Sequence, residues 1–233
     1  MKIALLGYGK MGQVIERMAK ERGHEIVLKK DENNTYEGLS TADVAIDFSV
    51  PTAAVPNISN CFLVNVPVIS GTTGWLEQYD EMVALCTAKN GAFISSSNFS
   101  LGVNIFFEIN EYLAKMMAKL DHYSVAMEEI HHTQKLDAPS GTAISLAKGV
   151  IENSKYTDWT LDKPADNQIH IEAKRIATIP GTHKVTYNSE VDSIVIKHTA
   201  HNREGFALGA IIAAEWIVGK QGIFTMKDVL ELK

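Results

Sequence analysis

The chain has 233 residues, 45% of them hydrophobic and 21% charged, which is enough apolar material for one or two packed domains and argues against disorder. The formal net charge of −6 argues against non-specific nucleic-acid binding, because that function needs a basic surface. The two cysteines, Cys61 and Cys86, have the spacing of neither a redox pair nor a zinc site, so we expect reduced core residues and a cytoplasmic protein. The uncharged residues 48–76 contain three prolines and cannot cross a membrane as one helix.

The first elements of the chain predict a unit that binds a dinucleotide. Residues 2–6 and 25–28 are short apolar runs typical of buried strands, and the residues between them have the apolar period of a helix. The turn before that helix matches GxGxxG and consists of Gly7, Tyr8, Gly9, Lys10, Met11 and Gly12. In such a turn the first glycine makes the bend, the second admits a pyrophosphate, and the third lets the helix pack on the strand. A plain strand–helix turn is the alternative, and the strand–helix–strand context favours the nucleotide.

An acidic residue at the end of the second strand would bind the adenosine ribose. The candidates are Asp31 and Glu32, preceded by Lys29 and Lys30. Because neighbouring side chains on a strand point to opposite faces, one lysine should lie on the adenosine side and attract a 2′-phosphate. We therefore expect the use of both NADH and NADPH. A solvated charged turn is the alternative.

Three further strands, at residues 42–48, 66–70 and 92–95, alternate with helices at 52–64 and 76–89. In a parallel sheet the turns after these strands meet at the carboxyl edge, where ligands bind. We expect the turn after the strand at 66–70 to allow close approach of a nicotinamide ribose, with a simple turn as the alternative, and a polar loop follows the last strand at the same edge. Their residues are Gly71, Thr72, Thr73, Ser97, Asn98, Phe99 and Ser100.

The pattern changes after a long helix at residues 101–120. Alternating polar and apolar residues then predict strands of an open mixed sheet, mostly antiparallel, with one covered face. These strands are residues 122–130, 168–175, 183–187 and 192–200, and an apolar helix follows at 205–218. The predicted fold class is α/β: a Rossmann-type nucleotide domain, residues 1–101 completed by about 210–233, with a second α+β domain at 102–209.

Residues 128–142 combine several groups that suit one kind of ligand. The stretch contains, in order, His131, His132, Lys135, Ser140, Gly141 and Thr142. The histidines exchange protons near neutral pH, and the lysine is a cation. The serine is a good N-cap for a helix, and the N–H groups that follow a cap bind anions. The stretch therefore predicts a site for a small, anionic, protonatable molecule, with a polar surface loop as the alternative.

A metal site formed by His131 and His132 with Glu128 or Glu129 is a further alternative. Adjacent side chains on a strand point to opposite faces, so the two histidines could not easily share one ion. We therefore expect no metal.

Seven stretches of the chain carry further information together, in order: residues 7–12, 71–73, 97–100, 129–143, 180–183, 198–203 and 206–210. They resemble the 4-hydroxy-tetrahydrodipicolinate (dihydrodipicolinate) reductase family. The resemblance covers nearly the whole chain, and residues 129–143 are its most specific part. The sequence Arg175-Ile176-Ala177-Thr178 departs from the family, which often has a glycine-containing turn after the arginine.

The resemblance implies a role for each candidate residue. Residues 7–12 would bind the pyrophosphate, Asp31 the ribose, and residues 71–73 and 97–100 the nicotinamide. His131 would be the catalytic proton donor and acceptor, and Lys135 a second proton donor. The substrate would be held by His132, Gly141 and Thr142.

The resemblance also implies a reaction and an assembly. The reaction reduces 4-hydroxy-tetrahydrodipicolinate to tetrahydrodipicolinate with NADH or NADPH and releases water, in lysine and diaminopimelate biosynthesis. The partners would be a small dicarboxylate and other copies of the chain in a homotetramer built through the second domain's sheet, with neither nucleic acid nor membrane. Another NAD(P)-dependent imino- or amino-acid dehydrogenase, or a non-enzymatic nucleotide sensor, would have the same nucleotide domain.

Overall fold

The structure is a computed structural model that describes residues 1–232, and the chain divides into two compact units. Unit 1 consists of Met1–Leu101 and the segment that starts at Glu204, and unit 2 is Gly102–Arg203. The chain returns to unit 1 earlier than the predicted residue near 210, because the whole of helix α6 (Glu204–Ile217) belongs to the unit 1 core. Among the described residues, no helix combines the length and the apolar character needed to cross a membrane.

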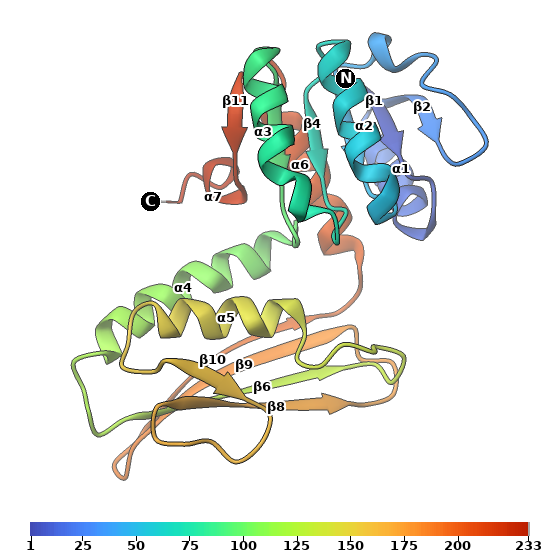
Figure 1. The fold of residues 1–233 in the computed structure, drawn as a ribbon. Helices are drawn as coiled ribbons and strands as arrows, with labels where there is room; N and C mark the ends of the chain where they lie inside the picture. The colour runs from blue at the N-terminus through green and yellow to red at the C-terminus, as the bar shows by residue number, and fades with distance from the viewer. Residues whose placement is uncertain (233) are drawn as a thin grey trace. The chain divides into compact units, whose positions relative to one another are not determined.

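Unit 1 is built on a sheet of six parallel strands in the order β11-β5-β4-β3-β1-β2 (Figure 1). The strands are β1 (Lys2–Leu6), β2 (Glu25–Lys30), β3 (Val44–Asp47), β4 (Val68–Ser70), β5 (Ala92–Ser95) and β11 (Gly222–Phe224). From β1 the chain proceeds first to β2 on one side and then to β3 on the other. The turn after β1 therefore lies at the switch point of the sheet, where ligands bind in open α/β folds.

Helices cover both faces of this sheet. One core includes α1 (Lys10–Glu21), α6 and α7 (Met226–Val229), and the other includes α2 (Pro51–Leu63) and α3 (Tyr79–Ala88). Alternate residues of β1 serve the two cores: Ile3 and Leu5 belong to the first, and Ala4 and Leu6 to the second. Burial of both faces explains why the strands are nearly continuous apolar runs in the sequence.

Several boundaries in unit 1 differ from the predicted ones. Helix α2 begins at Pro51, where a missing N–H costs no hydrogen bond, and it continues through Pro56. A short 3-10 helix, Leu76–Gln78, precedes α3 and takes the first turn of the helix predicted at 76–89. A second 3-10 helix, Leu39–Thr41, precedes β3. Strand β11 and helix α7 were not predicted, because elements of three and four residues are too short to show a period.

Unit 2 is a five-stranded sheet, in the order β10-β9-β6-β8-β7, with two helices over one face (Figure 1). Its elements are α4 (Leu101–Met117), β6 (Ser124–His131), α5 (Gly141–Ile151), β7 (Asp158–Thr160), β8 (Gln168–Arg175), β9 (Gly181–Asn188) and β10 (Ser193–Ala200). The sheet is mixed, as predicted, but only two of its four pairings are antiparallel. The connection through α5 is a crossover, which makes β6 parallel to β8.

The two faces of the unit 2 sheet differ in character. Val125 and Met127 of β6 face a core that includes residues of α4 and α5. Glu128, the residue after Met127, lies on the other face. It pairs with Lys174 of β8 and, at 2.9 Å, with Lys184 of β9. These partners lower the pKa of Glu128 to about 2, with the Lys174 ammonium as the largest influence.

Candidate active site

The three glycines of the turn after β1 meet the requirements of a dinucleotide site. Gly7 has a φ of +99°, and a Cβ there would lie 2.2 Å from the carbonyl oxygen of Phe48, so only glycine fits. A Cβ on Gly12 would lie 2.4 Å from the carbonyl oxygen of Gly7, which shows how closely α1 approaches the turn. A Cβ on Gly9 would meet no atom within 4 Å. The space beside the Cα atom of Gly9 is therefore open, and a ligand can approach the backbone there.

The turns after β3, β4 and β5 contact one another at the same edge of the sheet, through a hydrogen bond and through aromatic packing. The Ser49 N–H donates to Thr72 Oγ1 at 2.8 Å. A Cβ on Gly71 would lie 2.3 Å from the ring of Phe48, and the rings of Phe48 and Phe99 are 5.8 Å apart. Unit 1 thus brings the predicted nicotinamide turns together, and their mutual packing sets the shape of the edge.

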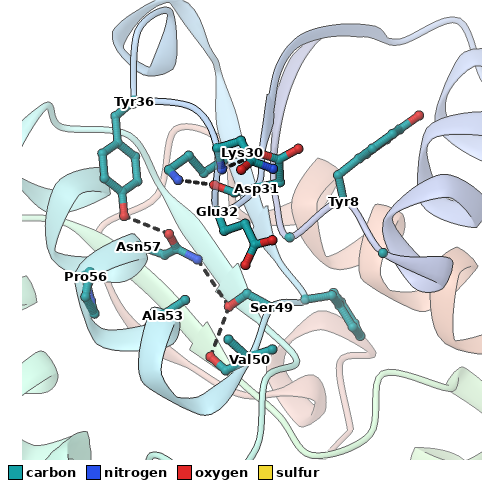
Figure 2. Close-up of a pocket in the computed structure, with 14 residues that line it drawn as sticks. Tyr8, Lys30, Asp31, Glu32, Tyr36, Ser49, Val50, Ala53, Pro56 and Asn57 are labelled. Carbon is teal, nitrogen blue, oxygen red and sulfur yellow. Dashed lines mark hydrogen bonds between the residues drawn. The ribbon is translucent and has the colours of Figure 1, made fainter.

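A pocket of about 600 Å³ opens beside the glycine turn (Figure 2). Four predicted residues line it: Gly7, Tyr8, Gly9 and Asp31. Tyr36, Ala53 and Pro56 add an apolar wall that suits a flat base such as adenine. The sequence does not predict this apolar wall, because its residues come from a loop and from a helix that contain no functional motif.

The other predicted unit 1 residues lie outside this pocket. Lys10, Met11 and Gly12 form the first turn of α1. Thr73 and Ser97 are exposed and Gly71 is half-buried, whereas Thr72, Asn98, Phe99 and Ser100 are buried. The buried four shape the edge, and the exposed pair is open to a ligand.

A chain of hydrogen bonds supports the pocket wall from below. Figure 2 shows the Tyr36 hydroxyl, which donates to Asn57 Oδ1 at 2.8 Å, and the Asn57 amide, which donates to Ser49 Oγ at 3.2 Å. The same amide donates at 2.9 Å to Asp47, which is fully buried and also accepts from Ser70 Oγ at 2.7 Å. Burial raises the pKa of Asp47, and the hydrogen bonds to its carboxyl oppose that rise. Asp47 therefore joins the pocket wall to the turn after β4.

The two lysines at the end of β2 have different surroundings. Lys29 Nζ lies 2.6 Å from Glu16 Oε1 of α1, and this lysine does not line the pocket. Lys30 lines the pocket, donates to the carbonyl oxygen of Asp31, and lies 5.3 Å from the centre of the Tyr36 ring. Of the two lysines, Lys30 is therefore the one that lines the pocket.

In unit 2, His131 ends β6 beside a buried carboxylate. Glu129 is fully buried, and its Oε2 lies 3.2 Å from His131 Nδ1. Its Oε1 accepts from Arg175 Nη2 at 3.0 Å and from the N–H of Ser140 at 3.1 Å. Burial raises the pKa of Glu129, but the groups around the carboxyl, first among them His131, outweigh burial and lower that pKa to about 2. Glu129 is a carboxylate at neutral pH.

His183 lies on the other side of this carboxylate. Its Nε2 is 3.8 Å from Glu129 Oε2 and 3.1 Å from Ser140 Oγ. Burial, and next the neighbouring His131, lower the pKa of His183 to about 3, so it is neutral at pH 7. The sequence predicted a role for His131 but not the cluster that it forms with Glu129, Arg175 and His183. These residues come together only through the register of strands β6, β8 and β9.

The predicted substrate residues surround this cluster. Ser140 caps α5 by accepting from the N–H of Ala143 at 3.2 Å, so Gly141 and Thr142 are the first two residues of the helix. A Cβ on Gly141 would meet no atom within 4 Å, so the helix start is open. The macrodipole of α5 favours an anion at this position.

Lys135 and His132 each have a polar neighbour. Lys135 Nζ lies 2.8 Å from both carboxylate oxygens of Asp137, and this ion pair lowers the pKa of Asp137. His132 is half-buried, and its Nε2 is 3.4 Å from Arg203 Nη2. The ammonium of Lys135 remains partly exposed, with 22% of the side chain accessible, so an anionic ligand can compete with Asp137 for it.

The ligand atoms of Glu129, His131 and His183 lie within 4.8 Å of one another, a separation that a metal ion could bridge. The cluster differs from the metal site weighed in the sequence, because it pairs His131 with a histidine of β9 in place of His132. Arg175 already forms an ion pair with the same carboxylate and adds positive charge beside it.

Comparison with known proteins identifies the family. The model "Dihydrodipicolinate reductase, N-terminus" matches residues 1–99, and "Dihydrodipicolinate reductase, C-terminus" matches residues 102–230. The chain belongs to the dihydrodipicolinate reductase family. It is 57% identical over 233 residues to the 4-hydroxy-tetrahydrodipicolinate reductase of Christiangramia forsetii, covering 99% of this chain and 98% of that protein. It is 38% identical to the enzyme of that name from Staphylococcus saprophyticus, covering 98% and 100%.

A solved structure has the same fold. Dipicolinate-bound dihydrodipicolinate reductase from Paenisporosarcina sp. TG-14 matches with a TM-score of 0.75 at 21% identity, covering 97% of each chain. The two predicted parts of the α/β fold, a Rossmann-type sheet and a second mixed sheet, are confirmed. As a dihydrodipicolinate reductase, the chain is an oxidoreductase that uses NADH or NADPH. The glycine turn and the open pocket of unit 1 fit such a coenzyme.

Proposed function

We propose that this dihydrodipicolinate reductase reduces 4-hydroxy-tetrahydrodipicolinate to tetrahydrodipicolinate, with release of water, and that His131 exchanges the proton of the reaction. One observation carries the assignment to His131. Its imidazole lies against the Glu129 carboxylate, at 3.2 Å, in the same unit as the open start of α5 and the cation of Lys135. A proton donor, an anion site and a cation are what a dicarboxylate ring with an imine nitrogen requires.

Unit 1 binds the coenzyme in this proposal. Residues 7–12 hold the pyrophosphate, Asp31 binds the adenosine ribose, and residues 71–73 and 97–100 line the nicotinamide. The open space before Gly9 and the apolar wall at Tyr36 support these roles. Bound NADH or NADPH supplies the hydride.

Unit 2 holds the substrate and supplies the proton. The 4-hydroxyl group leaves as water with a proton from Lys135, and a proton lost from the neighbouring ring carbon restores the lysine. Hydride from the coenzyme then leaves an electron-rich ring that must take up one proton, and His131 gives it. Lys135 also binds a carboxylate. The second carboxylate binds at the start of α5, at Gly141 and Thr142, and His132 completes the site.

The test uses the aldol-type synthase of the pathway to generate the unstable substrate in the assay. Loss of nicotinamide absorbance should require both the synthase and this protein. Lys135→Ala should lower both substrate affinity and turnover, because one change removes a carboxylate partner and a proton source. Lys148→Ala is the matched control, since Lys148 lies on the exposed surface of α5 and pairs only loosely with Glu152, at 3.6 Å. A change confined to coenzyme affinity would contradict the assignment of Lys135 to the substrate.

The assembly in this proposal is a homotetramer formed through the open face of the unit 2 sheet. Val195 on that face is 51% exposed, and it lies opposite Thr186, which in turn lies opposite Ala126. A row of small and β-branched side chains beside the Glu128–Lys184 ion pair suits contact with another sheet. Light scattering should give four times the mass of the chain, and Val195→Glu should lower it. A wild-type protein that is monomeric at micromolar concentration would contradict this assembly.

The proposed place of action is the cytoplasm, and the proposed partners include no nucleic acid. Cys61 and Cys86 are both buried and unlinked, as in a reducing compartment. The net charge of −6 opposes a phosphate backbone. Cell fractionation and a mobility-shift assay with duplex DNA would test these two points.

A further inference from the structure

Glu129 occupies a central position among three neighbouring strands. It lies directly opposite His183 of β9 in the antiparallel pairing, and His131, two residues further along β6, lies opposite Arg175 of β8. Strand residues two apart point to the same face, so Glu129 and His131 face the same way. None of the Glu129 side chain is accessible to solvent. A buried carboxylate without partners would be costly, so its surroundings must account for its charge.

We propose that Glu129 is the positioning residue for His131: its carboxylate holds the imidazole at Nδ1 and leaves Nε2 for the proton exchanged with substrate. This inference rests on the proposed function of His131. The atoms Glu129 Oε2 and His131 Nδ1 are both buried and 3.2 Å apart. The contact falls short of hydrogen-bond geometry, and neither atom has another hydrogen-bond partner among the described residues. The two buried atoms therefore face each other without another hydrogen-bond partner, and they form an ion pair once the imidazole carries a proton.

The other nitrogen of the His131 ring lies beside Gly181 of β9. A Cβ on Gly181 would lie 3.1 Å from His131 Nε2, closer than most side-chain contacts allow. Glycine at this position therefore leaves the ring the space that it occupies. A carboxylate at Nδ1, with no side chain from Gly181 against Nε2, orients the imidazole for proton transfer at Nε2.

Two further contacts keep the Glu129 carboxylate in place. Arg175 balances its charge at Oε1, and the same guanidinium donates to the carbonyl oxygen of Lys135 at 3.3 Å. The N–H of Ser140 also donates to Oε1, so the carboxylate is joined to the cap of α5. One residue thus links the proposed proton donor to the proposed anion site. The charged and titratable groups around His131 are Glu129, Arg175, His183 and Lys135.

The variant Glu129→Gln tests the proposal with little change in shape. Its amide oxygen can still accept from Arg175 and Ser140, while its NH2 group faces His131 Nδ1 and cannot stabilise a protonated imidazole. We expect kcat to fall by at least about tenfold, and the pH at which kcat declines on the alkaline side to move down. The KM for NADH should stay within about twofold of wild type, because that site is built from other residues.

Glu128→Gln is the matched control. Glu128 is the adjacent residue of the same strand, is also an ion-paired carboxylate, and faces the opposite side of the sheet. Its loss should leave kcat and the pH profile within about twofold of wild type at the same oligomeric state. Thermal unfolding of both variants shows that each is folded under the assay conditions.

Two measurements separate positioning from a structural role. In the His131→Gln background, Glu129→Gln should cost less than about twofold in kcat, since residues that act as one unit are not additive. In ¹⁵N-labelled protein, the chemical shift of His131 Nδ1 reports whether this nitrogen carries a proton. We expect Nδ1 to lose its proton in Glu129→Gln and to keep it in Glu128→Gln. An unchanged resonance, or the same cost with and without His131, would overturn the inference and leave the role of His131 standing. Full turnover by His131→Gln alone would overturn the proposed function instead.

A metal ion bound by Glu129, His131 and His183 would give a different result. Under our proposal, wild-type protein dialysed against a chelator keeps its turnover and its pH profile. Turnover lost on dialysis and restored by Zn²⁺ alone would overturn the positioning role.

Discussion

The choice between NADH and NADPH provides a sensitive test of how the coenzyme pocket is built. Asp31, Glu32 and Lys30 line the proposed coenzyme pocket. There the two carboxylates would repel a 2′-phosphate, and the ammonium would attract it. Lys29 does not line the pocket: its ammonium lies 2.6 Å from Glu16 Oε1 and donates to the Tyr8 hydroxyl at 3.3 Å. Removing Lys30 should therefore weaken NADPH selectively, and removing Lys29 should not.

The size of the effect follows from the exposure of these groups. An ion pair at a solvated site contributes about 0–1 kcal/mol, and about 1.4 kcal/mol is a tenfold ratio. Opposite charges around the 2′ position should nearly cancel, so we expect wild-type kcat/KM values for the two coenzymes within about tenfold of each other. Lys30→Ala should shift their ratio towards NADH by about two- to fivefold, and high salt should reduce that shift.

The assay compares initial rates with both coenzymes at low and high ionic strength. Lys29→Ala is the matched control, and its ratio should stay within about twofold of wild type. A wild-type preference above about a hundredfold, unchanged by salt and by Lys30→Ala, would contradict this balance of charges. Only a shaped pocket produces such selectivity.

Three further predictions concern stability. Gly209→Ala should destabilise the protein by about 1–3 kcal/mol in urea unfolding, because the new Cβ would lie 1.7 Å from the carbonyl oxygen of Phe99, whereas Gly205→Ala on the same helix, with 3.6 Å of room, should be nearly neutral. Ala177→Gly should stabilise by up to about 1 kcal/mol, because Ala177 has a φ of +43° that glycine adopts without strain, and a loss of stability would contradict this. The free energy of unfolding should fall as the pH drops from about 6.5 towards 3, because the pKa of His183 is lowered to about 3 in the folded protein and the unfolded chain binds the extra proton. His183→Gln should therefore reduce the dependence of this free energy on pH between about pH 6.5 and 4.5. An unchanged dependence would show that other groups cause it.

The parts of the fold that the sequence predicts best are those with local causes. The glycine turn is specified by close contacts that only glycine permits, as at Gly7 and Gly12. The N-cap at Ser140 is a property of one residue and its next three neighbours. Strands with both faces buried, such as β1, show as unbroken apolar runs.

The parts that the sequence could not predict depend on register and packing. Glu129 and His183 are separated by 53 intervening residues, and only the pairing of β6 with β9 makes them neighbours. Which of Lys29 and Lys30 enters the pocket depends on the position of Glu16 in α1. In the turn after Arg175, Ala177 takes a left-handed conformation with a φ of +43°, which nothing in the local sequence indicates.

The turnover of His131→Gln in the synthase-coupled assay shows whether His131 exchanges the proton of the reaction. His122→Gln, which changes an exposed histidine of unit 2, is the control. We expect His131→Gln to fold, to retain coenzyme affinity and to lose about 10²- to 10⁴-fold in kcat, while the control stays near wild type. Turnover of His131→Gln within a few-fold of wild type would contradict the claim.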